Sequence, residues 1–194
     1  YNIKGYQIGD TIKTSVFYKG DTFAFTDMIV TIGNEQIRGK GSLSISKDFT
    51  LKAEGKALTL GNVHKDIPKP LRSMTLSELK ISGHGSLDKP YIEASSRLAV
   101  SDHGPKYAIR GNGKVVLDQK RLSIRSELLD NKMLLKGNLS LEENMQWRLR
   151  ADLKTTRYDF LISNFFKELP EDLVLNLNGH IEAWGNRDEV NATA

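Results

Sequence analysis

Alternation between apolar and polar residues is the feature that most constrains the fold of this chain. From residue 43 to residue 57 the odd positions are mostly apolar and the even positions mostly polar, and residues 139–153 repeat the pattern. Successive side chains of a β-strand point to opposite faces of a sheet, so each segment has one apolar face and one hydrated face. Lys47-Asp48 and Glu143-Asn144 have turn-forming side chains and divide each run into two strands. The pattern therefore predicts antiparallel strands joined by short turns.

The same alternation extends over most of the chain and predicts about twelve to fourteen strands in a mainly β fold. Two stretches depart from it. Residues 157–173 place apolar side chains at helical spacing as far as Pro170, which predicts an amphipathic helix of about three turns. Residues 62–74 carry a weaker version of that spacing, and Pro68 and Pro70 limit the length of the helix it predicts.

The chain also contains an internal repeat. An offset of 96 residues lays residues 41–53 on residues 137–149, and residues 79–84 on residues 175–180, without a gap. Both predicted helices fall between these two matches, one in each copy. Repeats that cannot bury their own apolar face must stack to do so, and they build extended bodies. We therefore expect one continuous β-groove fragment of a longer protein, in which 1–36 is the tail of a preceding unit, 37–132 is the first unit and 133–194 is a truncated second unit.

Composition narrows the possible functions. The 194 residues include 28 Lys and Arg against 24 Asp and Glu, and these cations are scattered, whereas nucleic-acid binding favours cations clustered among aromatic residues. Cysteine is absent, which excludes disulfides and thiolate chemistry. No run approaches the roughly 18 apolar residues of a membrane-spanning helix. The chain begins without an initiator Met or a signal-peptide pattern, so we expect any membrane anchor to lie outside it.

Sequence motifs give no support for an enzyme. The four histidines lack metal-ligand spacing, and His84 and His180 are expected to mark equivalent turns of the repeat. The stretch Gly111–Lys114 resembles a phosphate-binding loop only in composition, because no Ser or Thr and no helix follow it, so we interpret it as a β-turn. We therefore expect no catalytic residue, no cofactor and no metal.

Three features together resemble a known family. They are a strand pair of the form Leu135–Leu141, an amphipathic helix that ends in Leu-Pro (Phe160–Pro170), and a strand pair around Gly85–Pro90. This combination resembles the TamB and AsmA-like proteins, and the resemblance covers most of residues 37–194. It implies an elongated antiparallel sheet curled into an open apolar trough, or β-taco, with short amphipathic helices inserted once per repeat. The second copy departs from the pattern at Gly185–Asp188, which lacks the Leu and Pro of the first.

The resemblance also implies a function and a location. Proteins of this family are bridge-like lipid carriers of the Gram-negative envelope, anchored in the inner membrane and extending through the periplasm. They are expected to carry phospholipid towards an outer-membrane barrel partner of the TamA type. The family is also associated with the assembly and secretion of outer-membrane proteins and autotransporters, which is the alternative function. In that role an exposed β-edge would bind client strands.

A lipid carrier needs a continuous apolar strip, because each methylene group exposed to water costs about 0.8 kcal/mol. We interpret the apolar alternation as the floor of such a strip. The predicted lipid-groove residues are Leu43, Ile45, Phe49, Leu51, Leu139, Leu141, Met145, Trp147 and Leu149. The alternative is a closed β-sandwich, a non-catalytic binding module whose dry core these same residues would form.

The aromatic stripe of the second predicted helix has two interpretations. Phe160, Leu161, Phe165 and Phe166 lie on one face of that helix. They either pack over the sheet as a permanent cover or form a gate that lipids displace. The bound partner in both cases is a phospholipid or another acyl-chain ligand.

Overall fold

The structure is a computed structural model of the whole chain. It describes residues 10–63, 67, 72–100, 109–158 and 174–194, together with residues 2–3 and 6–7. Among these residues, no helix is long and apolar enough to cross a membrane.

Fourteen strands and one short helical turn make up the described elements. The strands β1 and β2 contain two residues each and pair with one another. The elements run in the order β1 (Asn2–Ile3), β2 (Tyr6–Gln7), β3 (Thr11–Lys19), β4 (Thr22–Ile32), β5 (Glu35–Ser44), β6 (Asp48–Thr59), the 3-10 turn η1 (Leu60–Asn62), β7 (Met74–Ser86), β8 (Lys89–Val100), β9 (Ile109–Asp118), β10 (Arg121–Leu128), β11 (Met133–Ser140), β12 (Trp147–Arg157), β13 (Asn176–Gly185) and β14 (Val190–Thr193).

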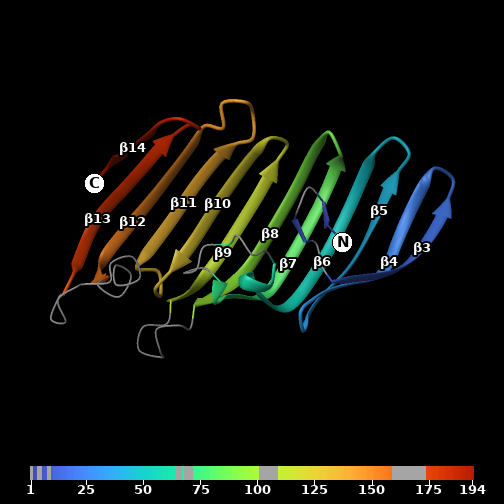
Figure 1. Cartoon of the computed structure of the whole chain (residues 1–194), viewed down its shortest axis with the longest axis horizontal. Coiled ribbons are helices and arrows are strands. Elements are labelled where there is room, and N and C mark those ends of the chain that lie inside the picture. Colours follow the sequence, from blue (N-terminus) through green and yellow to red (C-terminus); the bar gives the residue numbers. More distant parts are fainter. Residues whose placement is uncertain are drawn as a thin grey trace.

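A single twelve-stranded sheet contains all the strands from β3 to β14 (Figure 1). Each strand pairs antiparallel with the strands that precede and follow it in the chain, and the order from one edge to the other is the order of the sequence. The sheet is open, because β3 and β14 each have one neighbour. The prediction of a mainly β, antiparallel fold is confirmed, and its strand number is correct.

The connections differ between the two ends of the sheet. At one end, which we call the turn end, short turns such as residues 45–47 and 87–88 join the strands. The opposite end, the connection end, is where the longest connections lie, residues 60–73, 101–108 and 158–175. An antiparallel meander places every second connection at the same end, so all three long connections leave the sheet there.

The inserted amphipathic helices are not confirmed. The described part of 62–74 follows η1, and β7 begins at Met74. Of the predicted helix at 157–173, only residues 157 and 158 are described, and Arg157 is the last residue of β12. The rest of that helix lies outside the described residues. The predicted gate residues Phe160, Leu161, Phe165 and Phe166 therefore also lie outside the described residues.

Two sequence interpretations are wrong. Gly111–Lys114 is an internal part of β9 and not a turn, and His84 and His180 lie within β7 and β13. The glycines of β9 have a packing reason. A Cβ atom on Gly113 would lie 3.0 Å from the side chain of Leu98 on the neighbouring strand, so glycine leaves the space that this leucine fills.

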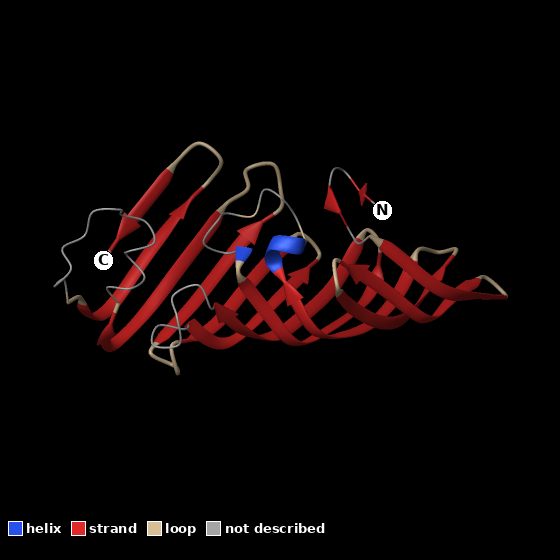
Figure 2. Cartoon of the chain, turned by 60° about the horizontal axis from the view of Figure 1, so that its bottom comes forward, coloured by secondary structure: helices blue, strands red, loops and turns tan. Residues whose placement is uncertain are grey.

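Irregularities in the ladders are concentrated in the first half of the sheet. The register shifts near Asp27 in β4 and near Glu78 in β7, where both residues have positive φ angles, 53° and 52°. One further shift lies between Leu153 and Thr156 in β12. Bulges of this kind bend a strand and increase its twist. Figure 2 shows bent strands in the N-terminal part of the sheet and straighter strands towards the C-terminus.

Buried apolar side chains gather at the connection end. Ile32, Leu58 and Leu79 form a cluster, with Val63 packed against it just after η1. Val100, Leu128, Leu153 and Tyr158 are also buried near this end of their strands. The 96-residue offset lays β5, β6 and β7 over β11, β12 and β13, but the division into units stays a prediction, because the sheet is continuous across it.

Candidate functional site

The ladder register decides which side chains share a face, because residues directly opposite one another in a pair point to the same side. One row crosses the sheet from β6 to β12 through direct partners. Its members are apolar or glycine throughout: Leu51, Gly83, Ile92, Leu117, Leu122, Leu139 and Trp147. We call the side of the sheet that carries this row the apolar face.

A second row runs parallel to the first, nearer the middle of the strands. It extends from β4 to β13 through direct partners. Its members are Met28, Gly39, Ala53, Ile81, Ala94, Val115, Ile124, Gly137, Leu149 and Ala183. No polar side chain interrupts either row, so the apolar strip is continuous across at least seven strands in the first row and ten in the second.

The structure places six of the nine predicted lipid-groove residues on the apolar face. Leu43 lies opposite Phe49, and Leu139 lies opposite Trp147. The other two of the six, Leu51 and Leu149, lie opposite glycines. The two predicted groups are separated by β7 to β10, but the rows pass through those four strands and join them.

The remaining three predicted residues lie in turns at the turn end. Ile45 and Leu141 follow the last residues of β5 and β11, and Met145 precedes β12 with a φ angle of 40°. All three are exposed. Strict alternation cannot locate the point at which a strand ends, so these residues were assigned to the strip although they extend beyond it.

Large side chains cover the glycines of the apolar face. A Cβ atom on Gly83 would lie 3.0 Å from the ring of Phe49 and 3.4 Å from Ile92, and one on Gly137 would lie 3.3 Å from Leu149. Phe49 and Leu149 thus lie partly over a glycine of the next strand. This packing fills the gaps in the rows.

The middle row of the apolar face is more open in the second half of the sheet than in the first. Val115, Ile124 and Leu149 are 37%, 41% and 45% exposed. Monomeric proteins rarely expose a large contiguous apolar surface unless it binds something. Among the described residues, the small β1–β2 pair is the only other sheet, so no second layer of a β-sandwich is formed within this part of the chain.

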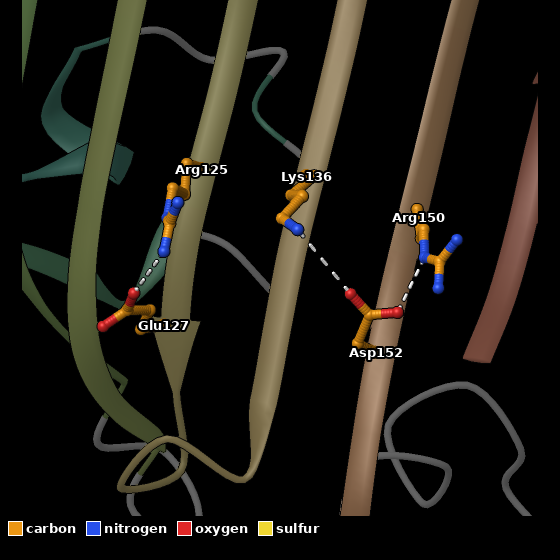
Figure 3. Close-up of polar contacts among 5 residues, drawn as sticks. All are labelled: Arg125, Glu127, Lys136, Arg150 and Asp152. Carbon is orange, nitrogen blue, oxygen red and sulfur yellow. Dashed lines mark hydrogen bonds and ion pairs between the residues drawn. The ribbon is translucent and has the colours of Figure 1, made fainter. Parts of the chain in front are cut away.

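The opposite face, which we call the charged face, carries ion pairs in its C-terminal half (Figure 3). Asp152 contacts Arg150 at 2.7 Å and Lys136 at 3.9 Å, and Arg125 contacts Glu127 at 3.0 Å. The hydrogen bond from Arg150 and the nearby charge of Lys136 lower the pKa of Asp152. These pairs join cations and carboxylates of β10, β11 and β12 on one face.

Two polar anchors hold equivalent positions at the connection end. The Glu35 carboxylate accepts hydrogen bonds from the backbone and hydroxyl of Thr59 at 2.9 and 2.7 Å, and from Asn62 at 3.3 Å. Burial alone would raise the pKa of Glu35, but these hydrogen bonds outweigh burial and lower it. The anchor fixes the start of the 60–73 connection to the β4–β5 turn.

The corresponding anchor in the second half is Tyr158. Its buried hydroxyl lies 2.9 Å from the carbonyl of Lys132 and 2.8 Å from that of Lys154, to which it donates. Burial raises the pKa of this hydroxyl. Tyr158 therefore fixes the end of β12 to the β10–β11 turn. In the same way, Glu35 fixes the end of β6 to the β4–β5 turn.

Sequence reasoning missed several residues of the strip. Val115, Leu122 and Ile124 were not among the predicted groove residues, although they lie in the two rows. Part of the signal was present, because Val115 and Leu117 have the same parity, and Leu122 and Ile124 alternate with polar residues. What the sequence lacks is the register that aligns these strands with the others.

Other chemistry finds little support in the part of the chain that the structure describes. No three His, Asp or Glu side chains gather there at a spacing that could hold a metal ion. In comparisons with known proteins, no family model, no curated protein and no solved structure matches this chain.

Proposed function

We propose that the apolar face binds the acyl chains of phospholipids and that the chain is a segment of a lipid carrier of the TamB and AsmA-like kind. The observation that carries this proposal is the pair of uninterrupted apolar rows on an open sheet. An enzyme would need converging polar groups on such a surface, and the rows contain none.

The dimensions of the strip suit lipid tails. Strands about 4.8 Å apart give twelve strands a width of roughly 50 Å. A single leaflet's tails are about 15 Å long. Each methylene group that leaves water for the strip gains about 0.8 kcal/mol, so a sixteen-carbon tail gains on the order of 12 kcal/mol before ordering costs. The strip offers room for several tails side by side.

The same proposal includes a trough. Val63, the residue that follows η1, packs against the apolar cluster at the connection end, and in Figure 2 the N-terminal strands bend towards the side on which η1 lies. Bending towards the apolar side supports a sheet that curls around its ligand. Within the larger protein, we place this segment in the periplasm, attached to an inner-membrane anchor and leading to an outer-membrane barrel partner of the TamA type.

The experiment compares two neighbouring valines on opposite faces. Val115 belongs to the apolar face, and Val116 lies opposite Glu93 and Ser123 on the charged face. Val115→Asp should reduce co-purified phospholipid in native mass spectrometry at least about tenfold, because a carboxylate on the strip loses its hydration. Val116→Asp introduces the same side chain one residue away and should leave bound lipid unchanged.

A loss of bound lipid could also result from unfolding, and a separate measurement distinguishes the two causes. Circular dichroism should give the same strand content for both variants and the parent chain. As a second measurement, a photoreactive residue at position 117 should crosslink to a lipid tail, and one at position 116 should not. Equal loss of lipid in both variants, or no lipid bound to the parent chain, contradicts the proposal.

The alternative function, client-strand binding by an exposed β-edge, has one observation in its favour. β3 and β14 are open edges, and β3 is nine residues long with Val16, Phe17 and Tyr18 exposed. An unpaired edge of this length is a template for another strand. Crosslinks from β3 to a client chain, without bound lipid on the apolar face, would favour that function.

A further inference from the structure

The charged face is different in the first half of the sheet. Glu54 in β6 lies directly opposite Arg38 on β5 and Lys80 on β7. Lys52 and Lys56 lie two residues before and after Glu54 on the same face of β6, about 7 Å away along the strand. Lys40, the direct partner of Lys52, completes the group. We call these six residues the cationic cluster.

The cluster holds much more positive than negative charge. Five cations surround one carboxylate, a net charge of +4, which equals the formal net charge of the whole chain. Within the described ranges, none of these five side chains forms an ion pair. Two neighbouring acids are engaged, since Glu78 contacts Arg97 at 2.9 Å and Glu93 contacts Lys114 at 2.8 Å. A third, Asp27, lines the same hollow as Lys40 and Lys52.

The surface at the cluster is hollowed. Two adjoining hollows of about 680 and 850 Å³ share Arg38, Glu54 and Lys80 as lining residues. The first also contacts Lys40 and Lys52, with Asp27 among its lining residues, and the second contacts Lys56. A twisted sheet is concave along one diagonal on each face, which explains how a hollow forms on the side opposite the apolar strip. These volumes lie in the range of small-molecule sites.

We propose that the cationic cluster is a binding site for a ligand that carries at least two phosphate groups. Each lysine supplies three hydrogen-bond donors and the arginine five, and all five side chains are exposed. The cations spread over three strands, so their positions are about 5 to 15 Å apart. One phosphate cannot contact them all, but two or more linked phosphates can. Charge-assisted hydrogen bonds to phosphate are the strong ones for lysine and arginine.

This site is independent of the lipid-binding strip, because its side chains point to the other side of the sheet. The ligand can be a soluble polyphosphate or the phosphate groups of a lipid headgroup at a membrane surface. Titration calorimetry with inorganic triphosphate tests the first source. Co-sedimentation with vesicles of phosphatidylcholine containing cardiolipin, whose headgroup links two phosphates, against pure phosphatidylcholine vesicles, tests the second.

The test uses two double variants with the same loss of charge on the same face. Lys52→Gln with Lys80→Gln removes two cations of the cluster and should weaken binding of the probe at least about tenfold. Arg125→Gln with Lys136→Gln removes two cations that are paired with carboxylates, and should weaken it less than about twofold. Binding of the parent chain should fall as salt concentration rises.

A third variant has the opposite expected sign. Glu54→Gln removes the carboxylate at the centre of the cluster and should tighten binding of the same probe several-fold, an effect that structural damage would not produce. Binding to triphosphate, to the anionic vesicles or to both supports the site and identifies the source. Binding to neither probe, equal losses in the two double variants, or no gain with Glu54→Gln overturns the proposal.

Discussion

The two six-stranded halves of the sheet, β3–β8 and β9–β14, have the same topology, and an offset of 96 residues lays β5–β7 over β11–β13. The two halves nevertheless differ on both faces. In the middle row of the first half, Gly39, Ala53 and Ala94 are small, and the strands bend. In the same row of the second half, Val115 and Leu149 are larger and more exposed. The comparison teaches that alternation selects the apolar face, whereas the sizes of the residues on it decide how open that face is.

The charged face differs in a parallel way. In the first half, five cations surround a single carboxylate, and in the second half Arg125, Lys136 and Arg150 each contact an acid. A cation paired with a carboxylate attracts an anionic partner only weakly, whereas an unpaired cation attracts it strongly. The cations of the cluster are therefore more available to anions than these three paired cations.

The difference in burial can be tested first, because it has the largest expected effect. Leu79→Ala removes a side chain that is 5% exposed from the Ile32–Leu58–Leu79 cluster and should lower the free energy of unfolding by about 2–5 kcal/mol. Ile124→Ala, at a site that is 41% exposed in the second half, should cost about 1 kcal/mol or less. Urea denaturation measures both values. Equal losses would show that the two halves are buried to the same degree.

The two anchors provide a test of intermediate size. Tyr158→Phe leaves the carbonyls of Lys132 and Lys154 without the hydroxyl and should cost about 1–2 kcal/mol at every pH from 3 to 7, because the hydroxyl titrates only above its raised pKa. Glu35→Gln should cost a similar amount at pH 7.

The pH dependence distinguishes the anchors. The folded pKa of Glu35 is lowered, so its contribution is complete above the pKa of an unfolded Glu, about 4.3, and is lost as pH falls below that value. The difference between the parent chain and Glu35→Gln should therefore shrink as pH falls below about 4.3 towards the lowered folded pKa, while that for Tyr158→Phe persists. A Glu35→Gln effect that is the same at pH 3 and pH 7 would contradict the carboxylate's role.

The smallest expected effect concerns the paired charges of the second half. Asp152→Asn frees Lys136 and Arg150 and should leave the unfolding midpoint almost unchanged, because both pairs are exposed. The same variant should increase the affinity of the chain for triphosphate by about twofold, since two cations of the second half become available. Calorimetry measures this change, and an unaltered affinity would mean that pairing does not explain the contrast between the halves.

Much of the fold follows from the sequence by local rules. Alternation located strands such as β6 and β12, and the turn residues near Lys47 and Asn144 separated them from their neighbours. The error at Gly111–Lys114 has a tertiary cause. Its glycines resemble a turn locally, but they lie in a strand because Leu98 of the adjacent strand requires the space above Gly113.

The candidate site was less accessible to the same reasoning. Phe49 and Leu149 were identified by parity, but the bridging residue Leu122 was not, because membership of a row depends on register between strands. The cationic cluster was interpreted as scattered charge for the same reason. Arg38, Glu54 and Lys80 are far apart in the sequence and become neighbours only when β5, β6 and β7 are paired.

The meander has a consequence for how such a protein can change its length. Every ladder of the large sheet joins strands that are consecutive in the chain, so a hairpin can be duplicated or deleted without breaking any connection elsewhere. Each hairpin adds roughly 10 Å to the width of the sheet, and both surfaces keep their character because the parity of the remaining strands is unchanged. The number of hairpins can therefore change during evolution, and the span of the molecule changes in proportion to it.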